Sequence, residues 1–214
     1  MRFLITAGPT REPLDPVRYL SNRSSGKMGF ALARAVIAEG HDCVLISGPV
    51  GIPCPSGVEL IKVETALEMY RAVQTHLPGC SVGIFAAAVA DYRPAELKGE
   101  KIKKDAREML LRLVKNPDIL GSAREVFGFK GVLVGFAAET NDVERYAEDK
   151  LRRKGCDLLV ANDVSRRDIG FDSEENEVIL LAPNQTPEKL GKRSKDEIAQ
   201  AIIARCLRIG NAER

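Results

Sequence analysis

The feature that most constrains the fold of this chain is a series of short apolar runs that alternate with helical patterns. The runs cover residues 3–7, 43–47, 58–63, 82–88, 132–137 and 157–162. They lack the strict alternation of apolar and polar residues that marks a half-exposed strand, so both faces of each strand are expected to be buried. Such strands, separated by helices, predict an α/β fold, a Rossmann-like three-layer sandwich with a mostly parallel sheet.

Amphipathic patterns predict where the helices lie. Residues 30–38 form an apolar helical stretch, and residues 65–76 carry apolar side chains at the spacing of one buried helix face. Residues 142–154 have the pattern of a charged surface helix. Near the C-terminal end, Ser194 and Glu197 have the spacing of a capping box, which predicts that a further helix begins there.

Two regions depart from this alternation. Residues 92–115 are polar and lysine-rich and predict a projecting flap that returns as a strand. Residues 169–183 predict a hairpin whose turn lies at 172–176, because a β-type run follows turn-forming residues. Between the first strand and the first helix, residues 8–10 are expected to open a long loop.

Length and composition limit the class of protein. The chain has 214 residues, 44% of them hydrophobic, which suits a single domain spanning 1–214. Lys and Arg total 32 against 30 Asp and Glu, and there is no Trp, so neither net charge nor stacking side chains indicate a nucleic-acid partner. No apolar run approaches the roughly 20 residues that cross a bilayer, and no leader pattern is seen, so we expect a soluble protein without a membrane partner.

The cysteines and histidines narrow the chemistry further. The five cysteines are widely spaced and include no Cys-x-x-Cys pair, which favours reduced structural thiols in a cytoplasmic protein over disulfides or a zinc site. The two histidines, His41 and His76, lie away from the segments that carry motifs. A histidine-based triad or metal site is therefore not expected.

Polar or small residues follow several of the predicted strands. These segments are residues 8–10, 86–93, 138–140 and 162–163. Open parallel sheets bind ligands beyond the carboxyl ends of their strands, so these segments are expected to line a site.

Residues 21–29, Ser-Asn-Arg-Ser-Ser-Gly-Lys-Met-Gly, open the first predicted helix and suggest a phosphate cradle. Backbone N–H groups at a helix start have no intrahelical partner and attract anions. The segment is not a P-loop, because Met28 replaces the required Ser or Thr and Ser21 replaces the first glycine; it also lacks a Gly-x-Gly-x-x-Gly fingerprint. An anion site and simple close packing of the helix on the sheet both remain open.

Two further patterns suit a nucleotide site but can also be explained without a ligand. The small side chains of residues 86–90 would let a ligand lie against the backbone before Asp91 and Arg93 supply charge, although they also suit tight packing. Lysines in residues 98–104 and the Lys150 and Lys154 pair at i, i+4 could contact phosphate oxygens, although exposed lysines are usually just solvated.

Taken together, these segments resemble a known family. The matching motifs are residues 5–19 (ITAGPTREPLDPVRY), 21–29, 87–93, 101–104 (KIKK), 115–118 (KNPD) and 135–140 (GFAAET). In this order they are similar to bacterial phosphopantothenate-cysteine ligases, and the resemblance runs from about residue 3 to residue 176.

The resemblance implies a ligase of coenzyme A biosynthesis. In that family the carboxylate of 4′-phosphopantothenate attacks the α-phosphate of CTP, which releases pyrophosphate and leaves an acyl-cytidylate, and the amine of L-cysteine then displaces CMP. The resemblance also implies Mg²⁺ with the nucleotide and a homodimer. Many relatives carry a flavin-dependent decarboxylase ahead of this domain, so the chain would be either a stand-alone ligase with that decarboxylase as a separate partner or one half of a bifunctional protein. CTP and ATP are not distinguished by the sequence.

The resemblance also implies the site residues. Asn22 and Lys101 would be catalytic, Lys101 as the flap lysine that closes over the triphosphate. Substrate contacts would come from Arg18, reaching across the dimer interface, and from Asn22, Ala87, Ala88 and Asp91. Nucleotide contacts would come from Ser24, Gly26, Phe85, Ala86, Ala87, Asp91, Lys101, Asn116, Pro117, Asp118, Ile119, Phe136, Lys150 and Lys154, with the Phe136 ring as a wall for the base. Pro9 departs from the family, where a second glycine is common.

Two other functions compete with this one. A nicotinamide-dependent Rossmann-type reductase would fit the opening strand and glycine, but the dinucleotide fingerprint is missing and only Tyr146 with Lys150 has Tyr-x-x-x-Lys spacing. A non-catalytic nucleotide-binding module would use the same loops without turnover.

Overall fold

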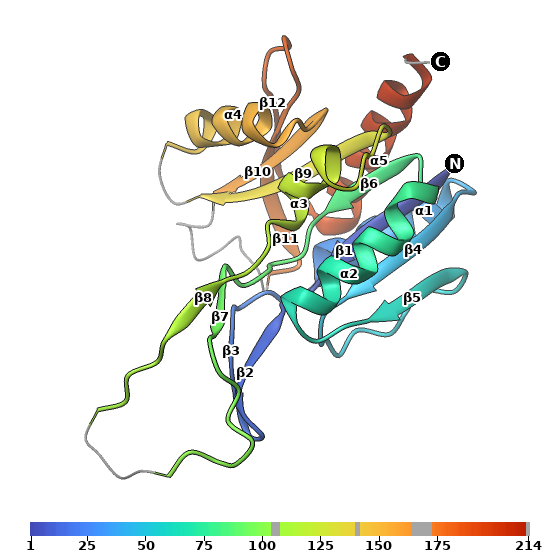
Figure 1. The fold of residues 1–214 in the computed structure, drawn as a ribbon. Helices are drawn as coiled ribbons and strands as arrows, with labels where there is room; N and C mark the ends of the chain where they lie inside the picture. The colour runs from blue at the N-terminus through green and yellow to red at the C-terminus, as the bar shows by residue number, and fades with distance from the viewer. Residues whose placement is uncertain (104–107, 140–141, 164–172, 213–214) are drawn as a thin grey trace.

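The computed structural model describes residues 1–103, 108–139, 142–163 and 173–212. Within these ranges the core is an eight-stranded sheet in the order β12-β11-β10-β9-β6-β1-β4-β5 (Figure 1). Its strands are β1 (Arg2–Ala7), β4 (Asp42–Ser47), β5 (Val58–Lys62), β6 (Val82–Phe85), β9 (Val132–Glu139), β10 (Leu158–Asp163), β11 (Glu175–Leu181) and β12 (Glu188–Ser194). All neighbours from β5 to β10 pair in parallel, and β11 and β12 are antiparallel, which confirms the predicted mostly parallel sheet.

The strand order reverses direction next to β1. The chain first builds outward through β4 and β5, then returns to the other side of β1 and builds through β6, β9 and β10. In doubly wound sheets this switch point leaves a crevice beyond the carboxyl ends of the two strands that flank it. The expected place for a ligand is therefore next to the ends of β1 and β6.

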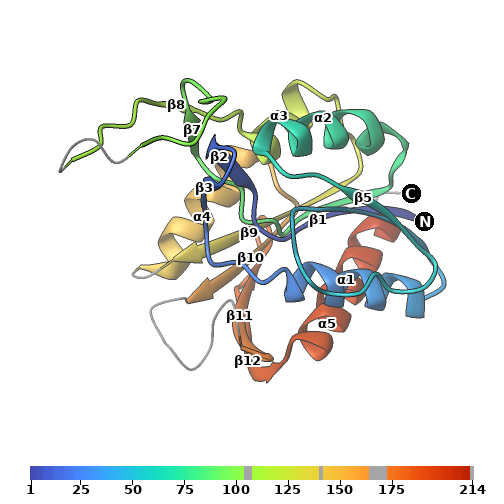
Figure 2. The ribbon, with the colours of Figure 1, turned by 90° about the horizontal axis from the view of Figure 1, so that it is seen from below.

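Helices cover both faces of the sheet, as the three-layer prediction requires. Helices α1 (Lys27–Ala38) and α5 (Lys195–Ala212) pack on one face, and α2 (Ala66–His76), α3 (Ile119–Glu125) and α4 (Val143–Lys154) pack on the other, with a short 3₁₀ turn, η1 (Leu77–Gly79), after α2 (Figure 2). Alternate side chains of each strand reach opposite layers: Phe3 and Ile5 belong to the cluster under α1 and α5, and Leu4 to the other. Both faces of the central strands are buried, which explains why those runs are continuously apolar.

Local signals set the helix ends. Thr65 caps α2 by accepting a hydrogen bond from the Glu68 N–H, and Ser194 and Glu197 form the predicted capping box at α5. The first helix begins at Lys27, earlier than the predicted residue 30, because Gly26 occupies the left-handed region (φ 80°) and turns the chain directly into the helix.

A projecting arm is formed by residues 11–21 and by the described part of 92–115 (Figure 1). The predicted long loop after β1 is instead a hairpin of β2 (Arg11–Asp15) and β3 (Arg18–Ser21). The predicted flap does return as a strand, because β8 (Leu113–Lys115) pairs with β7 (Tyr92–Pro94). The hairpin was missed because Pro13 and charged residues interrupt its apolar pattern.

The predicted hairpin at 169–183 is displaced along the chain. Residues 164–172 lie outside the described residues, and β11 already begins at Glu175, so the turn is not at 172–176. The hairpin joins β11 to β12 through residues 182–187, where Asn184 takes a positive φ of 58°. The sequence did not predict strand β12, because Leu190 is its one buried hydrophobic residue and the strand therefore has no apolar pattern.

The sulfur and imidazole groups have structural surroundings. All five cysteines are free thiols, and burial raises the pKa of Cys43, Cys156 and Cys206 to about 12. His41 stacks on Phe3 with ring centres 5.7 Å apart. Each helix within the described ranges is too short or too polar to cross a membrane.

The contact between α1 and β1 yields a stability prediction. A Cβ added to Gly29 would overlap Cβ of Ala7 and lie 3.1 Å from its Cα. We expect Gly29→Val to lower the free energy of unfolding by about 1–3 kcal/mol, since overpacking forces the helix off the sheet. Urea unfolding measures the change.

The matched control is Gly191→Val on the edge strand β12, where nothing lies within 4 Å of the added Cβ. The control is expected to stay within about 0.5 kcal/mol of the wild type. Equal unfolding free energies for the two variants would contradict the close approach at Gly29.

Candidate functional site

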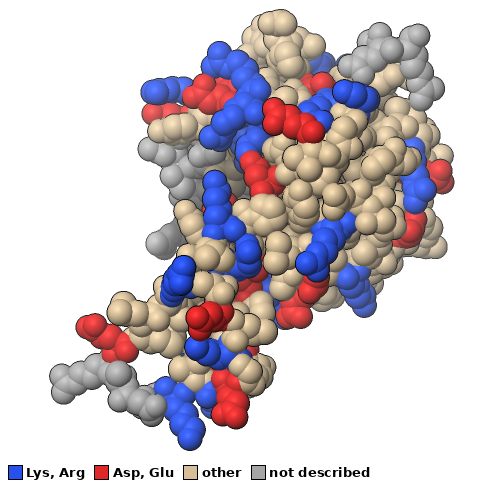
Figure 3. Space-filling model, in the orientation of Figure 1, with Lys and Arg blue, Asp and Glu red and all other residues tan. Residues whose placement is uncertain are grey.

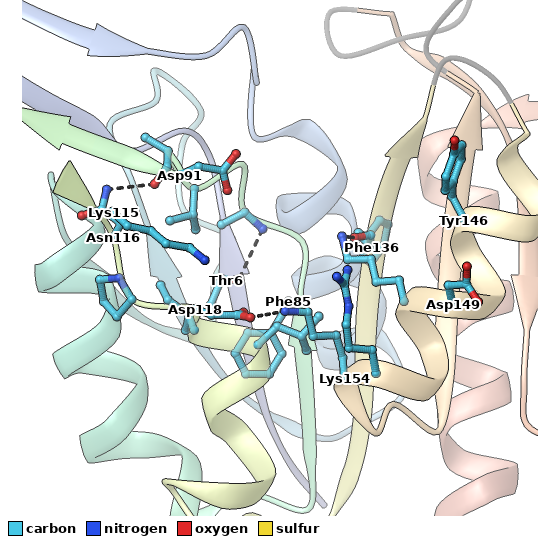
Figure 4. A pocket seen from close by; sticks show the side chains of 18 of the residues that line it. Thr6, Phe85, Asp91, Lys115, Asn116, Asp118, Phe136, Tyr146, Asp149 and Lys154 are labelled. Atoms are coloured by element: carbon cyan, nitrogen blue, oxygen red, sulfur yellow. Dashed lines mark hydrogen bonds and ion pairs between the residues drawn. The ribbon is translucent and has the colours of Figure 1, made fainter. Parts of the chain in front are cut away.

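A cleft of about 1160 Å³ lies beyond the carboxyl ends of β6 and β9, between α3 and α4 (Figure 4). It brings together residues from segments that are far apart in the sequence. Of the residues predicted for the site, Phe85, Ala87, Asp91, Asn116, Pro117, Asp118, Ile119, Phe136, Lys150 and Lys154 line this cleft. The cleft thus joins the predicted small-residue segment, the KNPD motif and both helical lysines.

The small residues after β6 continue alongside the end of β1. The N–H of Ala86 donates to the Thr6 carbonyl (3.2 Å), that of Ala87 to Thr6 Oγ1 (3.2 Å), and that of Ala88 to the Gly8 carbonyl (2.9 Å). Side chains at Ala86 and Ala87 are half-buried. Both predicted readings therefore hold in part: the backbone packs tightly against β1, and Ala87 still faces the cleft.

Asn22 lies beside this segment, at the start of the loop before α1. Its Nδ2 donates to the carbonyl of Ala88 at 2.7 Å, and its side chain is exposed. The cleft is not lined by Asn22, Ala86 or Ala88 themselves. They lie next to it, because Ala86 and Ala88 flank the lining residue Ala87 and Asn22 contacts Ala88. The structure thus brings Asn22 next to the substrate positions predicted for Ala87 and Ala88.

Ser24 and Gly26 lie on the other face of the sheet, at the start of α1. Ser24 Oγ accepts from the Gly26 N–H at 3.4 Å, and a Cβ on Gly26 would lie 2.9 Å from Val50 Cγ1 and 3.3 Å from Gly8 Cα. Close packing therefore accounts for Gly26 and Gly29. The start of α1 still faces the same carboxyl edge as the cleft, so an anion at this helix start remains compatible with the geometry.

Asn162 belongs to the 162–163 segment that was expected to line a site, although no specific contact was predicted for it. It lies near the carboxyl end of β10 and, like Val160 two residues earlier, is on the face covered by α1 and α5. The residue is only 9% exposed, and its Oδ1 is the one buried side-chain polar atom without a partner in the described residues. An unsatisfied buried acceptor is costly, which indicates that a donor from a ligand or water belongs there. Its position at the end of a predicted strand was the available signal.

Positive charge gathers on the α4 side of the cleft. Lys150, Arg152, Arg153 and Lys154 all line it, and Figure 3 shows blue side chains clustered over this helix. Lys150 Nζ donates to the Phe136 carbonyl at 2.7 Å. Figure 4 shows Lys154 directed across the cleft to Asp118, with which it forms an ion pair.

Asp118 caps α3, and its charge is held by these neighbours. Its Oδ1 accepts from the Gly121 N–H at 2.9 Å. Partial burial raises the pKa of Asp118, but the hydrogen bonds from Lys154 and Gly121 outweigh burial and leave the pKa below its usual range. Asp118 is therefore a carboxylate within the protein that pairs with a lysine of the cleft.

Phe136 lines the cleft, and its use as a wall for the base stays a prediction. Its side chain packs against the cluster under α1 and α5, while its carbonyl faces Lys150 in the cleft. Phe85 belongs to the opposite cluster, on the face that holds the cleft.

Arg18 and Lys101 are not part of the cleft. Arg18 pairs with the buried Asp15 at 2.5 Å and donates to the Ile102 carbonyl at 2.9 Å, so it ties the β2–β3 hairpin to the flap. The Arg18 guanidinium holds the pKa of Asp15 well below its usual range. Lys101 is exposed beside this contact.

Comparison with known proteins agrees with this geometry. The family model described as "DNA/pantothenate metabolism flavoprotein C-terminal domain" matches residues 1–209. The coenzyme A biosynthesis bifunctional protein CoaBC of Vibrio vulnificus (strain YJ016) is 50% identical over 203 residues, covering 94% of this chain and 50% of that protein. The protein of the same name from Escherichia coli (strain K12) is 48% identical over 208 residues, covering 92% and 51%. The chain spans about half the length of these curated relatives.

Solved structures share the fold. A crystal structure of the C-terminal domain of CoaBC superposes with a TM-score of 0.83 at 37% identity and covers 98% of this chain and 96% of that chain. A Cab2 mutant in complex with phosphopantothenate-cysteine has a TM-score of 0.81 at 18% identity, covering 99% and 86%, and shows the likeness of fold alone. By the extent of the family match and the identity to its relatives, the chain belongs to the family of the DNA/pantothenate metabolism flavoprotein C-terminal domain.

Proposed function

We propose that this chain is a CTP-dependent phosphopantothenate-cysteine ligase of coenzyme A biosynthesis. The observation that carries the proposal is the cleft at the switch point, which gathers residues of four separate motifs around one basic wall. Family membership supports it, because the matched relatives are named for coenzyme A biosynthesis. The comparisons give no support to the nicotinamide-dependent reductase.

The proposed reaction needs positioning and charge more than a protein nucleophile. A carboxylate oxygen of 4′-phosphopantothenate forms a bond to the α-phosphorus of CTP as the bond to pyrophosphate breaks. The amine of L-cysteine then attacks the acyl carbonyl, loses a proton, and CMP leaves with the carboxyl-derived oxygen. Holding carboxylate and α-phosphate together can supply about 7–11 kcal/mol of the barrier.

The nucleotide is proposed to lie in the cleft with its phosphates toward Lys150, Arg152, Arg153 and Lys154. Lysine ammonium groups act as point charges on phosphate oxygens. Binding would release Lys154 from Asp118, because the triphosphate carries more charge than one carboxylate. The Ser24 to Gly26 turn and Asn162 would supply further contacts from the α1 side of the same edge.

Mg²⁺ enters the proposal with the triphosphate. No group of three or more His, Cys, Asp or Glu side chains within the described ranges could hold a metal ion by itself. Mg²⁺ commonly binds through substrate phosphates and water with one or two carboxylates, so this residue set fits an ion delivered with CTP. When bound, it would neutralise charge on the phosphates.

Asn22 and Asp91 are proposed to hold the pantothenate side of the reaction. One N–H of the Asn22 amide donates to the Ala88 carbonyl. An amide group has two N–H donors, and the second is proposed to donate to the oxygen on which negative charge develops during the reaction. Asp91, three residues after Ala88, lines the cleft. Lys101 is proposed to close over the triphosphate when the flap moves, since its place in this structure is outside the cleft.

The arm supports the proposal of a homodimer. Exposed large hydrophobic residues gather on it: Val17, Tyr19, Tyr92, Leu97, Met109, Leu110, Leu111 and Leu113. Elsewhere in the described ranges Val126 and Tyr146 are the two such residues. A concentration of apolar side chains on one projection is typical of a protein interface, and a second copy would carry Arg18 toward a neighbouring cleft.

The setting of the enzyme follows the same reasoning. Five free thiols support a reducing, cytoplasmic environment. The relatives are named as bifunctional proteins, and this chain matches about half of each. We therefore propose that a flavin-dependent phosphopantothenoylcysteine decarboxylase works next to it, either as a separate chain or in the same polypeptide.

A nucleotide assay tests the function directly. With Mg²⁺ and 4′-phosphopantothenate, CTP is expected to yield acyl-cytidylate and pyrophosphate in equal amounts. Adding L-cysteine is expected to convert the acyl-cytidylate to the amide product and to release one CMP for each amide formed. Mass spectrometry follows CMP, or AMP when ATP replaces CTP.

Each outcome of that assay has a distinct meaning. Faster AMP than CMP formation would keep the ligase and overturn the choice of CTP. Nucleotide binding without pyrophosphate release in the presence of both acid and amine would overturn the ligase and leave the non-catalytic binding module.

A substitution at Asn22 tests its catalytic role. Asn22→Asp removes the amide donor at the Ala88 carbonyl and places negative charge where charge develops, so kcat is expected to fall by about 10²–10³. Thermal unfolding should be nearly unchanged because the side chain is exposed.

The same chemical change at Asn184, on the far β11–β12 loop, serves as control and should leave kcat within about twofold of the wild type. An Asn22→Asp enzyme that turns over as fast as this control would remove Asn22 from the mechanism.

A further inference from the structure

We propose that Thr10, Asn116 and Arg93 form a positioning network for the ligase reaction, by fixing the two chain segments that carry Asn22 and Asp91. The inference rests on the proposed function for its catalytic readout. It concerns residues that act through others, and it gives Thr10 and Arg93 a role other than direct contact with a ligand.

Thr10 links three segments although it is fully buried, at 0% exposure. Its N–H donates to the Ala88 carbonyl (3.3 Å), its Oγ1 accepts from the Ala90 N–H (3.0 Å), and its carbonyl accepts from Ser21 Oγ (2.8 Å). A residue with no exposed surface does not touch substrate in this arrangement. Its three hydrogen bonds instead set the distance between the Asn22 segment and the Ala88–Ala90 segment.

Asn116 fixes the other end of the same segment. Its N–H donates to the Asp91 carbonyl and its Nδ2 to the Ala90 carbonyl, both at 2.8 Å. Its Oδ1 accepts from Arg93 Nη1 at 3.0 Å. Figure 4 shows Asn116 beside Asp91, with the backbone contact drawn. The side chain is 6% exposed and engaged at both amide atoms, which suits a structural clamp more than a nucleotide contact.

Arg93 connects the clamp to the root of the arm. It lies in β7, and its Nη1 donates to the Lys115 carbonyl at 2.8 Å as well as to Asn116. Lys115 ends β8, so the arm and the Ala90–Asp91 turn share one hydrogen-bonded corner. A continuous chain of contacts thus runs from Arg93 through Asn116, Ala90, Thr10 and Ala88 to Asn22.

Removing one link should misplace Asn22 and Asp91 without removing a ligand contact. A displacement of about 1 Å in an aligned site can cost roughly 100-fold in rate. Positioning therefore predicts a loss in kcat with little change in nucleotide affinity, whereas a ligand contact predicts a weaker affinity for CTP.

The experiment compares Thr10→Val, which loses the hydroxyl at constant size, with Thr10→Ser, which keeps it. We expect Thr10→Val to lower kcat roughly 10- to 100-fold with the KM for CTP within about twofold, and Thr10→Ser to recover most of the rate. Amide hydrogen exchange measured by NMR should show faster exchange at the Ala90 N–H in Thr10→Val and protection restored in Thr10→Ser.

Arg93→Met provides a second, less buried variant in case Thr10→Val folds poorly, with Arg71→Met on the exposed surface of α2 as its control. Arg93→Met should repeat the loss in kcat, and Arg71→Met should behave as the wild type.

Two kinetic results would overturn the network: kcat within twofold of the wild type in both Thr10→Val and Arg93→Met, or a raised KM for CTP with kcat unchanged. Unchanged exchange at the Ala90 amide would be a third. The exchange of the Ala90 amide is read without any substrate. A wild-type chain that makes no CMP would therefore refute the proposed function, while unchanged Ala90 protection in Thr10→Val would refute the network.

Discussion

The pairing of β1 with β6 is the constraint on which the rest of the site depends. The two strands run in parallel at the switch point of the sheet, and their contact continues past the strand ends as a bridge between Pro9 and Ala88. The chain leaves β1 toward one side of the sheet and later leaves β6 toward the other side. The loops that follow these two strands therefore diverge and leave a crevice at the carboxyl edge. This bridge is next to three parts of the site: Ala87 and Val89 line the cleft, Asn22 contacts Ala88, and the arm starts at Arg11.

Charge in the cleft is balanced internally. Asp118 pairs with Lys154, and the Phe136 carbonyl accepts from Lys150, so contacts within the protein hold both lysines of the basic wall in place. Preordered donors reduce the entropy lost on binding a triphosphate. The same arrangement favours strongly charged ligands, because a ligand must compete with the Asp118 carboxylate for Lys154.

Much of this could be predicted from the sequence, for identifiable reasons. Buried parallel strands such as residues 43–47 give continuous apolar runs, and Ser194 with Glu197 gives a capping box, so the sheet and α5 were predicted. Hairpin β2–β3 was missed because Pro13 and charged residues interrupt its apolar pattern, and β12 was missed because most of its residues are exposed and polar. The cleft residues were predicted through resemblance to a family, whereas the partners of Asn116 and the orphaned oxygen of Asn162 depend on tertiary contacts between distant segments.

The most direct test of the central claim is a crystal structure with 4′-phosphopantothenate and a CTP analogue whose α,β-bridge cannot be cleaved. The account predicts that the α-phosphate lies at the carboxyl edge of β1, β6 and β9, within reach of the Asn22 amide and beside Asp91, with the Lys154–Asp118 pair opened. Nucleotide bound at any other edge of the sheet, with Asn22 and Asp91 untouched by either ligand, would contradict it.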